Sequence, residues 1–242
     1  MRPKSLLLRL RNSLLHFWLC RFLEKFEMEG FTLSYSQCGE DLTLKTIFGK
    51  NRRSGFYIDI GCNNPIQKSN TFKLYLKGWK GICVDGNGLL IKQFKKIRKR
   101  DICLEAIVSD SKRELTFYQD NLNHELSSLD PVVGQELKAN NNDLIEIKAV
   151  STTLEEILGT HCQGPVKIDL LCVDVENHDL EVLKGNNFQK YRPEIICVEF
   201  YVEDLTAIGQ TDLDLFMRGN GYEVLVYSAP NVFYRDKATA AG

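Results

Sequence analysis

Acidic and small polar residues stand at the ends of five apolar, strand-like segments of this sequence. In an open parallel sheet the carboxyl ends of the strands meet along one edge, and ligands bind there. A carboxylate at that edge can accept hydrogen bonds from hydroxyl groups or take a proton from one. The positions are Asp59 to Gly61, Asp85, Ile107 to Ser109, Asp174 to Glu176 and Glu199. The sequence therefore predicts a cleft for a hydroxyl-bearing ligand.

The stretch GFYIDIGCNNP, residues 55–65, leads from a strand into a glycine-led loop. Backbone can approach a ligand closely at Gly61 because glycine has no side chain. The dinucleotide fingerprint G-x-G-x-x-G is absent, since Gly61 is followed by C-N-N-P. Asp85 ends the next strand, where its carboxylate can accept both hydroxyls of a ribose. This pair suits an adenosyl cofactor, and the missing glycines favour S-adenosylmethionine over NAD.

Strand-like and helix-like segments alternate along most of the chain. Strands are expected over 57–60, 82–85, 102–108, 168–174 and 194–200, and helices over 69–77, 89–99, 153–158, 178–183 and 212–219. The segments 222–228 and 231–236 are spaced as an antiparallel hairpin. The pattern predicts an α/β, Rossmann-like fold of the class I methyltransferase type. Its seven-stranded sheet is mostly parallel, ends in the hairpin and carries helices on both faces.

Two segments stand apart from this alternation. Residues 1–30 form a predicted amino-terminal extension, a basic amphipathic helix whose charged residues exclude a membrane-spanning segment. This helix either lies on an anionic membrane surface or packs on the domain, residues 31–242, or on a second subunit. Residues 119–143 are polar with little periodicity and form either a lid over the substrate or a surface loop.

Composition limits the location and the partners. The 31 basic and 32 acidic residues nearly cancel, so no nucleic-acid partner is expected. The eight cysteines form no C-x-x-C pair and indicate reduced thiols in a cytoplasmic protein. The run KQFKKIRKR, residues 92–100, reads most simply as the solvated face of a helix, with Phe94 and Ile97 inward. The alternative is a surface for an anionic acceptor or a membrane.

Three stretches carry more specific motifs: YSQCGEDLTL at 35–44, GFYIDIGCNNPIQKSNTFKLYLKGWKGICVDGN at 55–87, and IDLLCVDVENHDLEVLKG at 168–185. Together they resemble the FkbM family of S-adenosylmethionine-dependent methyltransferases over about residues 36–236. The resemblance implies O-methylation of hydroxyls on sugars or small molecules, as in polysaccharide biosynthesis. Two positions depart from the family pattern: Asn177 replaces a glycine, and Gly86 replaces a proline or alanine. Asparagine tolerates a left-handed backbone well.

The resemblance and the strand ends together give a set of predicted cofactor-binding residues. They are Gln37, Glu40, Asp41, Asp59, Gly61, Asn63, Asn64, Ser69, Asn70, Asp85, Asn87, Ile107 and Ser109. Asp85 is assigned to the ribose, and Asp59 and Gly61 to the amino acid end of the cofactor. Residues 69–71 could instead cap the following helix, and Gln37, Glu40 and Asp41 could be an exposed helix start.

Methyl transfer to an alcohol requires an aligned acceptor oxygen and the removal of one proton. The predicted catalytic residues are Asp174, Glu176 and His178, although His178 is also typical of a solvated helix start. A turn beginning at Val175 would bring both carboxylates into the cleft. Together with Glu199 they could hold a divalent cation, but three scattered acids are a weak signal and no metal site is predicted.

The sequence thus predicts a cytoplasmic O-methyltransferase that uses S-adenosyl-L-methionine and a carbohydrate or small-molecule acceptor, with possible peripheral membrane contact through the amino-terminal helix. Two alternatives remain open at this point. One is an NAD-dependent nucleotide-sugar oxidoreductase, which would require phosphate-binding glycines and a Tyr-x-x-x-Lys pair. The other is a degenerate binding module in which Asn177 blocks the cleft.

Overall fold

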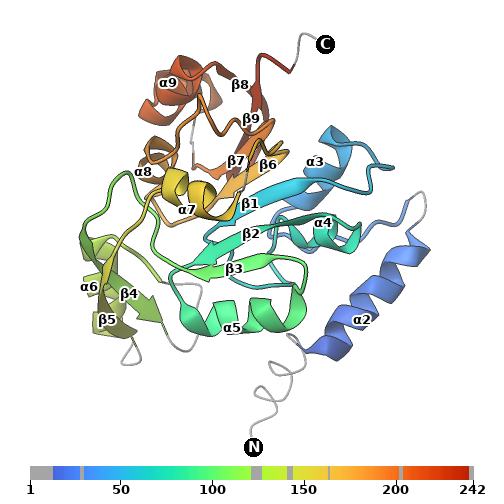
Figure 1. Cartoon of the computed structure of the whole chain (residues 1–242), viewed down its shortest axis with the longest axis horizontal. Coiled ribbons are helices and arrows are strands. Elements are labelled where there is room, and N and C mark those ends of the chain that lie inside the picture. Colours follow the sequence, from blue (N-terminus) through green and yellow to red (C-terminus); the bar gives the residue numbers. More distant parts are fainter. Residues whose placement is uncertain are drawn as a thin grey trace, which may run out of the picture.

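The structure is a computed structural model that describes residues 13–27, 30–120, 127–140, 144–162, 164–201 and 204–239. Its centre is a seven-stranded sheet with the order β3-β2-β1-β6-β7-β9-β8 (Figure 1). The strands are β1 Phe56–Ile60, β2 Lys80–Asp85, β3 Ile102–Glu105, β6 Leu170–Val173, β7 Ile195–Glu199, β8 Tyr222–Ser228 and β9 Asn231–Asp236. The first five are mutually parallel, whereas β9 pairs antiparallel with both β7 and β8. The predicted Rossmann-like sheet is confirmed.

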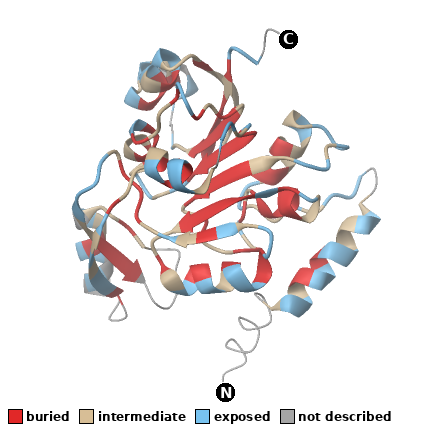
Figure 2. Cartoon of the chain, in the orientation of Figure 1, coloured by how far each residue is buried: buried red, intermediate tan, exposed pale blue. Residues whose placement is uncertain are grey.

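Alternate residues of the central strands point to two separate apolar cores. Ile58 and Ile60 belong to a core with α7 Leu154–His161, α8 Asp179–Lys184 and α9 Asp212–Gly219. Tyr57 belongs to the opposite core, with α3 Glu40–Ile47, α4 Phe72–Leu76 and α5 Gly88–Ile97. The central strands are accordingly buried along most of their length (Figure 2). This two-faced cover leaves the strand ends as the places where a ligand can reach the sheet.

An excursion between β3 and α7 forms a small second sheet, which the sequence patterns do not predict. Strands β4 Glu114–Asp120 and β5 Leu144–Val150 pair antiparallel, and α6 Pro131–Asn140 lies between them in the chain. The described part of residues 119–143 thus includes a helix, while residues 121–126 and 141–143 lie outside the described residues. Phe117 and Tyr118, which lie on opposite faces of β4, are both buried, so β4 lacks the plain alternation of a strand with one buried face.

The amino-terminal extension contributes α2 Leu14–Leu23 and the short 3-10 helix η1 Glu24–Phe26. Phe17 and Cys20 of α2 are buried in the core that also contains Phe72 and Tyr75. The expectation of a helix packed on the domain is therefore met by one face of α2. A further 3-10 helix, η2 Leu205–Gln210, precedes α9. Within the described ranges, no helix has both the length and the apolar character needed to cross a membrane.

Candidate active site

A cleft of about 270 Å³ opens at the carboxyl ends of β1, β2, β6 and β7. Its base is formed by residues at these strand ends, and one wall comes from the excursion through Phe117, Ser127, Ser128 and Leu129. The predicted site residues that line it are Gln37, Gly61, Asn63, Asp85, Ile107, Asp174 and Glu176. The structure therefore brings together residues that are separated by more than half of the sequence.

Gly61 is the point of closest approach between the β1 loop and the end of β6. Its backbone has a φ of 77°, and its N–H donates to the Val84 carbonyl at 2.9 Å. A Cβ atom at this position would lie 1.8 Å from the carbonyl oxygen of Asp174. No residue with a side chain fits without movement of one of these loops, so glycine at this position is required by geometry.

Asp85 lies between the two loops that follow β1 and β2. Its Oδ2 accepts from the Asn63 N–H at 2.9 Å, and its Oδ1 accepts from the Asn87 N–H at 2.8 Å. Asn87 in turn caps α5, because its Oδ1 accepts from the Leu89 N–H at 2.9 Å. A carboxylate has about four acceptor positions. Asp85 therefore fixes both loops, and it also lines the cleft.

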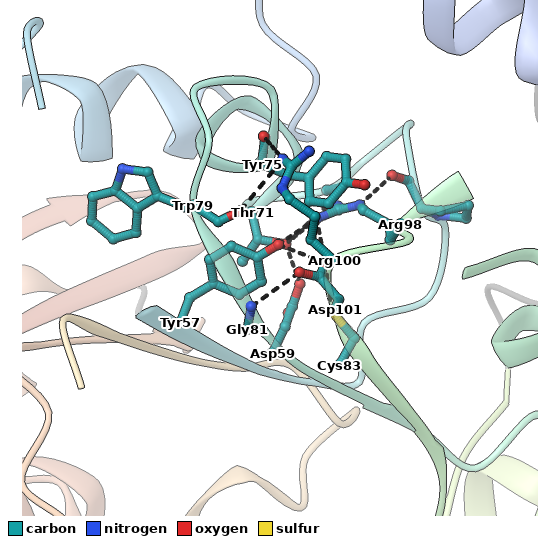
Figure 3. A network of polar contacts seen from close by, with 12 residues as sticks. Tyr57, Asp59, Thr71, Tyr75, Trp79, Gly81, Cys83, Arg98, Arg100 and Asp101 are labelled. Atoms are coloured by element: carbon teal, nitrogen blue, oxygen red, sulfur yellow. Dashed lines mark hydrogen bonds and ion pairs between the residues drawn. The ribbon is translucent and has the colours of Figure 1, made fainter. Parts of the chain in front are cut away.

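A buried polar network around Arg98 holds the loop between Gly61 and α4 in place (Figure 3). The guanidinium donates to the Pro65 carbonyl at 2.8 Å and to Ser69 Oγ at 2.7 Å. It also donates to Thr71 Oγ1 at 3.3 Å, and Thr71 donates to Asp59 at 2.5 Å. The expected capping role of residues 69–71 is wrong for Thr71, which makes no side-chain cap bond. Its hydroxyl is committed to the network.

Arg98 also corrects the interpretation of residues 92–100 as a solvated face. Its side chain is fully buried, and it lies 3.6 Å from Asp101, which accepts from Tyr57 Oη at 2.6 Å. Burial raises the pKa values of Asp59 and Asp101, and the guanidinium charge opposes that rise. Phe94 and Ile97 are buried as expected, whereas Lys92 and several other lysines of the run are exposed.

The other end of the cleft is acidic, with Asp174, Glu176 and Glu199 in its lining. Asp174 is exposed to the cleft, although many protein atoms lie around its carboxyl group. This desolvation, together with the negative charges of Glu199, Asp179 and Glu176, raises the pKa of Asp174 well above its usual range. Desolvation and Glu199 also raise the pKa of Glu176. The cleft thus contains carboxyl groups of increased basicity next to one another.

The turn after β6 brings both predicted carboxylates into the cleft. The Asp174 N–H still pairs with the Ile60 carbonyl at 3.0 Å, and the chain then turns, with Val175 N–H donating to Asp179 Oδ1 at 3.1 Å. Desolvation, with the charges of Glu199 and Glu176, raises the pKa of Asp179 to about 7.

Among the described residues, no group of three or more acids, cysteines or histidines is arranged to hold a metal ion.

Strained backbone is concentrated at this cleft. In the described chain, positive φ values at residues other than glycine occur at Asn63, Lys68, Glu176 and Asn177. The first three line the cleft, and Asn177 adjoins it. Asn177 has a φ of 67°, so the asparagine adopts the left-handed conformation that a glycine would take there. Such conformations persist where the surroundings enforce them, and they cluster at functional sites.

The remaining predicted site residues do not line the cleft, and most of them bind other protein groups. They are Glu40, Asp41, Asp59, Asn64, Ser69, Asn70, Asn87, Ser109 and His178. Glu40 and Asp41 begin α3, as the alternative interpretation predicts, but both are fully buried and not exposed. Asp41 accepts from Ser34 and Ser36, and Glu40 accepts from Asn231 at 2.9 Å. Their contact with a cofactor stays a prediction.

His178 lies beside the cleft and contacts Ser109, with 3.0 Å between Nε2 and Oγ. Burial lowers the pKa of His178, so the imidazole is neutral at neutral pH. A neutral histidine can still exchange a proton, but here its nearest described partner is Ser109 rather than a group in the cleft lining. His178 stands at the start of α8, as the alternative interpretation predicts, but its side chain is only 18% exposed and so is not fully solvated.

Many of the lining residues are not among the predicted site residues, and three of them bear on the shape or the charge of the cleft. The sequence marks Glu199 only as a strand end, and its patterns do not single out Lys68 or Phe117. The Phe117 ring lies over Gly86, where a Cβ atom would approach it to 3.0 Å. This contact gives a physical reason for glycine at position 86. The signal available in the sequence was the β-favouring run from Leu115 to Tyr118, which is typical of a strand.

The donor set of the cleft suits an adenosyl cofactor with a positively charged centre. Asp85 offers a carboxylate to a ribose, Ile107 and Phe117 offer apolar walls, and Gly61 allows close approach of backbone. The carboxylates at the opposite end complement a sulfonium and an ammonium group. The cleft volume lies just below the range of about 300–1,000 Å³ typical of ligand sites.

Comparison with known proteins agrees with this arrangement. A search of curated proteins found no significant match. A family model described as the methyltransferase FkbM domain matches residues 59–224. This match runs from Asp59 in β1 to β8 and includes the strand ends that form the base of the cleft. Since it covers well over half of the chain, the protein belongs to the FkbM methyltransferase family.

Proposed function

We propose that this methyltransferase uses S-adenosyl-L-methionine to methylate a hydroxyl of a sugar, a glycolipid or a related small molecule. The observation that carries the proposal is the placement of Gly61, Asp85 and Asp174 in one cleft. Two of these residues suit the cofactor, and the third suits the removal of a proton from the acceptor. The FkbM family membership supports methyl transfer, whereas the acceptor is inferred from the cleft.

The cofactor would be held by residues from three strand ends. Asp85 would accept from the ribose hydroxyls, and Ile107 and Phe117 would enclose the adenine. Gly61 and Asn63 would contact the amino acid end. When bound, S-adenosylmethionine supplies a methyl group on a positively charged sulfur. The chain aligns the acceptor with that group, and such alignment contributes roughly 7–11 kcal/mol to lowering a barrier.

Asp174 is the proposed base for the acceptor hydroxyl. Its raised pKa makes its carboxylate a stronger base than an ordinary aspartate, and it borders the cleft directly. Glu176 and Glu199 contribute negative charge beside it, which favours transfer of a proton to Asp174. The proton taken from the acceptor would then be shared within this group of carboxyls.

Polar groups at the cleft support a polyhydroxylated acceptor. Gln37, Lys68, Ser127 and Ser128 all line the cleft and can donate or accept hydrogen bonds. An acceptor that is rich in hydroxyls can exchange hydrogen bonds with such groups. We propose that this reaction belongs to polysaccharide biosynthesis and occurs in the cytoplasm. All eight cysteines lie in the described chain and are free thiols, which supports a reducing compartment.

The test is transfer of a labelled methyl group from S-adenosylmethionine to a panel of nucleotide sugars, lipid-linked sugars and free saccharides. The proposal predicts label on a hydroxyl oxygen of at least one acceptor, with the added CH₂ mass located by mass spectrometry. Asp174→Asn is the inactive reference, and Asp212→Asn, at an exposed position at the start of α9, is the matched control. Label found on nitrogen or carbon instead, with Asp174→Asn fully active, would overturn the assignment of an O-methyltransferase.

A further inference from the structure

An unusual concentration of exposed apolar side chains lies on the amino-terminal helices. Among the described residues, seven of the fifteen large hydrophobics that are exposed fall within residues 14–31. They are Leu14, Leu15, Trp18, Leu19, Phe22, Phe26 and Phe31. Trp18 is 60% exposed and Leu15 is 69% exposed. Contiguous apolar surface of this kind marks an interaction site in a folded protein.

These side chains form one face of α2, opposite the face that packs on the domain. Positions 14, 15, 18, 19 and 22 are spaced as neighbours on one side of a helix, whereas Phe17 and Cys20 point into the core. The alternation of exposed and buried residues along α2 is visible in Figure 2. The Phe22 and Phe26 rings lie 4.9 Å apart, so the apolar face continues into η1. The buried residues Phe17 and Cys20 fix α2 on the domain and so keep this apolar face exposed.

A basic groove of about 900 Å³ runs along the edge of this apolar face. Two carboxylates, Glu24 and Glu27, line it, and both are engaged by the buried Lys73. Burial and the nearby charges of Lys45 and Lys73 lower the pKa of Lys77, which reflects the crowding of positive charge. The basic residues that line the groove are Arg21, Lys25, Lys45, Lys50, Arg53 and Lys77.

The two features adjoin through Arg21 and Lys25. Arg21 and Lys25 are exposed, and the Arg21 guanidinium lies 5.9 Å from the centre of the Trp18 ring. A tryptophan beside an arginine, with leucines and phenylalanines on one face, is the composition of helices that lie in the interface of a membrane. The sequence before Ser13, outside the described residues, continues this composition with leucines and with Arg9 and Arg11.

We propose that this face, consisting of the exposed side of α2 and η1 and the basic groove, docks the protein on an anionic membrane surface. The apolar side chains enter the interfacial layer, and the groove receives negatively charged lipid headgroups. Lys45 is already paired with Glu27 at 2.6 Å, but an apolar partner surface would not neutralise the other cations of the groove. The groove residues Lys50 and Arg53 precede β1, at the opposite end of the strand from the cleft. Figure 1 shows α2 far from β4 and β5, so docking leaves the cleft open.

The test is flotation of the full chain with two kinds of vesicle, pure phosphatidylcholine and equimolar phosphatidylcholine and phosphatidylglycerol. We expect binding to the anionic vesicles only, weakened by salt because exposed charges are screened. Arg21→Gln with Lys25→Gln should lower the partition coefficient roughly 25-fold, about fivefold for each cation. Lys92→Gln with Lys96→Gln, two exposed lysines of α5, should bind like the unmodified protein.

The apolar contribution is tested with Trp18→Ser and Phe22→Ser together, and Leu215→Ser on α9, 55% exposed, is the control. The first should lose vesicle binding, and the control should keep it. Brominated lipids should quench Trp18, since the other tryptophan, Trp79, is fully buried. Circular dichroism and sedimentation of each variant show that it remains folded.

Three results would overturn the proposal. One is absence of binding to anionic vesicles, and another is equal binding of the basic-groove and α5 variants. The third is a change from dimer to monomer in the Trp18→Ser and Phe22→Ser variant with vesicle binding unaltered, which would identify a second copy as the partner. None of these results bears on methyl transfer to a soluble acceptor, so the proposed function is tested separately.

Discussion

Substitution of Gly61 by alanine tests the geometry on which the cleft depends. Two costs follow from the structure. The φ of 77° is left-handed, which costs roughly 1–2 kcal/mol for a residue with a Cβ atom. The Cβ would also lie 1.8 Å from the Asp174 carbonyl oxygen, and overpacking of this kind typically costs about 1–3 kcal/mol. The free energy of unfolding should therefore fall by about 2–5 kcal/mol.

Gly49→Ala is the matched control for this prediction. Its φ is 81°, but no atom lies within 4 Å of the position that a Cβ would take there, so only the left-handed cost applies. Urea denaturation of the two variants should show a loss of roughly 1–2 kcal/mol for Gly49→Ala and a clearly larger one for Gly61→Ala. The affinity for S-adenosylhomocysteine should fall only in Gly61→Ala. Equal losses of stability in both variants would refute the close approach of the two loops.

Three further predictions concern charges in and below the cleft. Arg98→Met should lower the free energy of unfolding by about 3–5 kcal/mol, because the substitution leaves buried carboxylates without a cation. The control Lys96→Met, at an exposed position, should lower it by at most about 0.5 kcal/mol. This loss of stability should become smaller from pH 7.5 to about pH 5, because a buried carboxyl with a raised pKa destabilises the folded state at pH values above that pKa. A loss that grows on acidification, measured by urea denaturation, would contradict the argument. Glu199→Gln should move the acidic limb of the pH–rate profile to lower pH, because removing its charge lowers the pKa of Asp174, and an unmoved limb would exclude that coupling. Asp174→Asn should lower turnover by about 10²–10⁴ with little change in cofactor affinity by calorimetry, and full turnover would place the base elsewhere.

The strand ends could be predicted from the sequence because they follow long apolar runs. In β1 and β6 every neighbour of the acidic residue is apolar, so both the strand and its end are marked clearly. The parallel arrangement then dictates that Gly61, Asp85 and Asp174 meet at one edge, as the structure shows. This part of the cleft depends on local pattern and topology alone.

The excursion and the buried network were missed for physical reasons. In α6 and β5 the apolar residues Val132, Ile145 and Val150 are exposed, so an apolar position there does not indicate burial. Arg98 was assigned to a solvated face because it stands within a run of lysines. Its spacing of four residues from the buried Phe94 was a signal for the inward face. Whether an arginine there is buried depends on distant acceptors such as Asp101, and those partners are set by tertiary structure.

The direct test of the cofactor assignment is calorimetric titration of S-adenosylhomocysteine into the unmodified protein, with NAD titrated in parallel. The account predicts saturable binding of S-adenosylhomocysteine and none of NAD. It also predicts that Asp85→Ala weakens the binding by about 1.5–3 kcal/mol, the value of a hydrogen bond to a charged group. No heat at millimolar S-adenosylhomocysteine with folded protein, or saturable binding of NAD instead, would contradict the account.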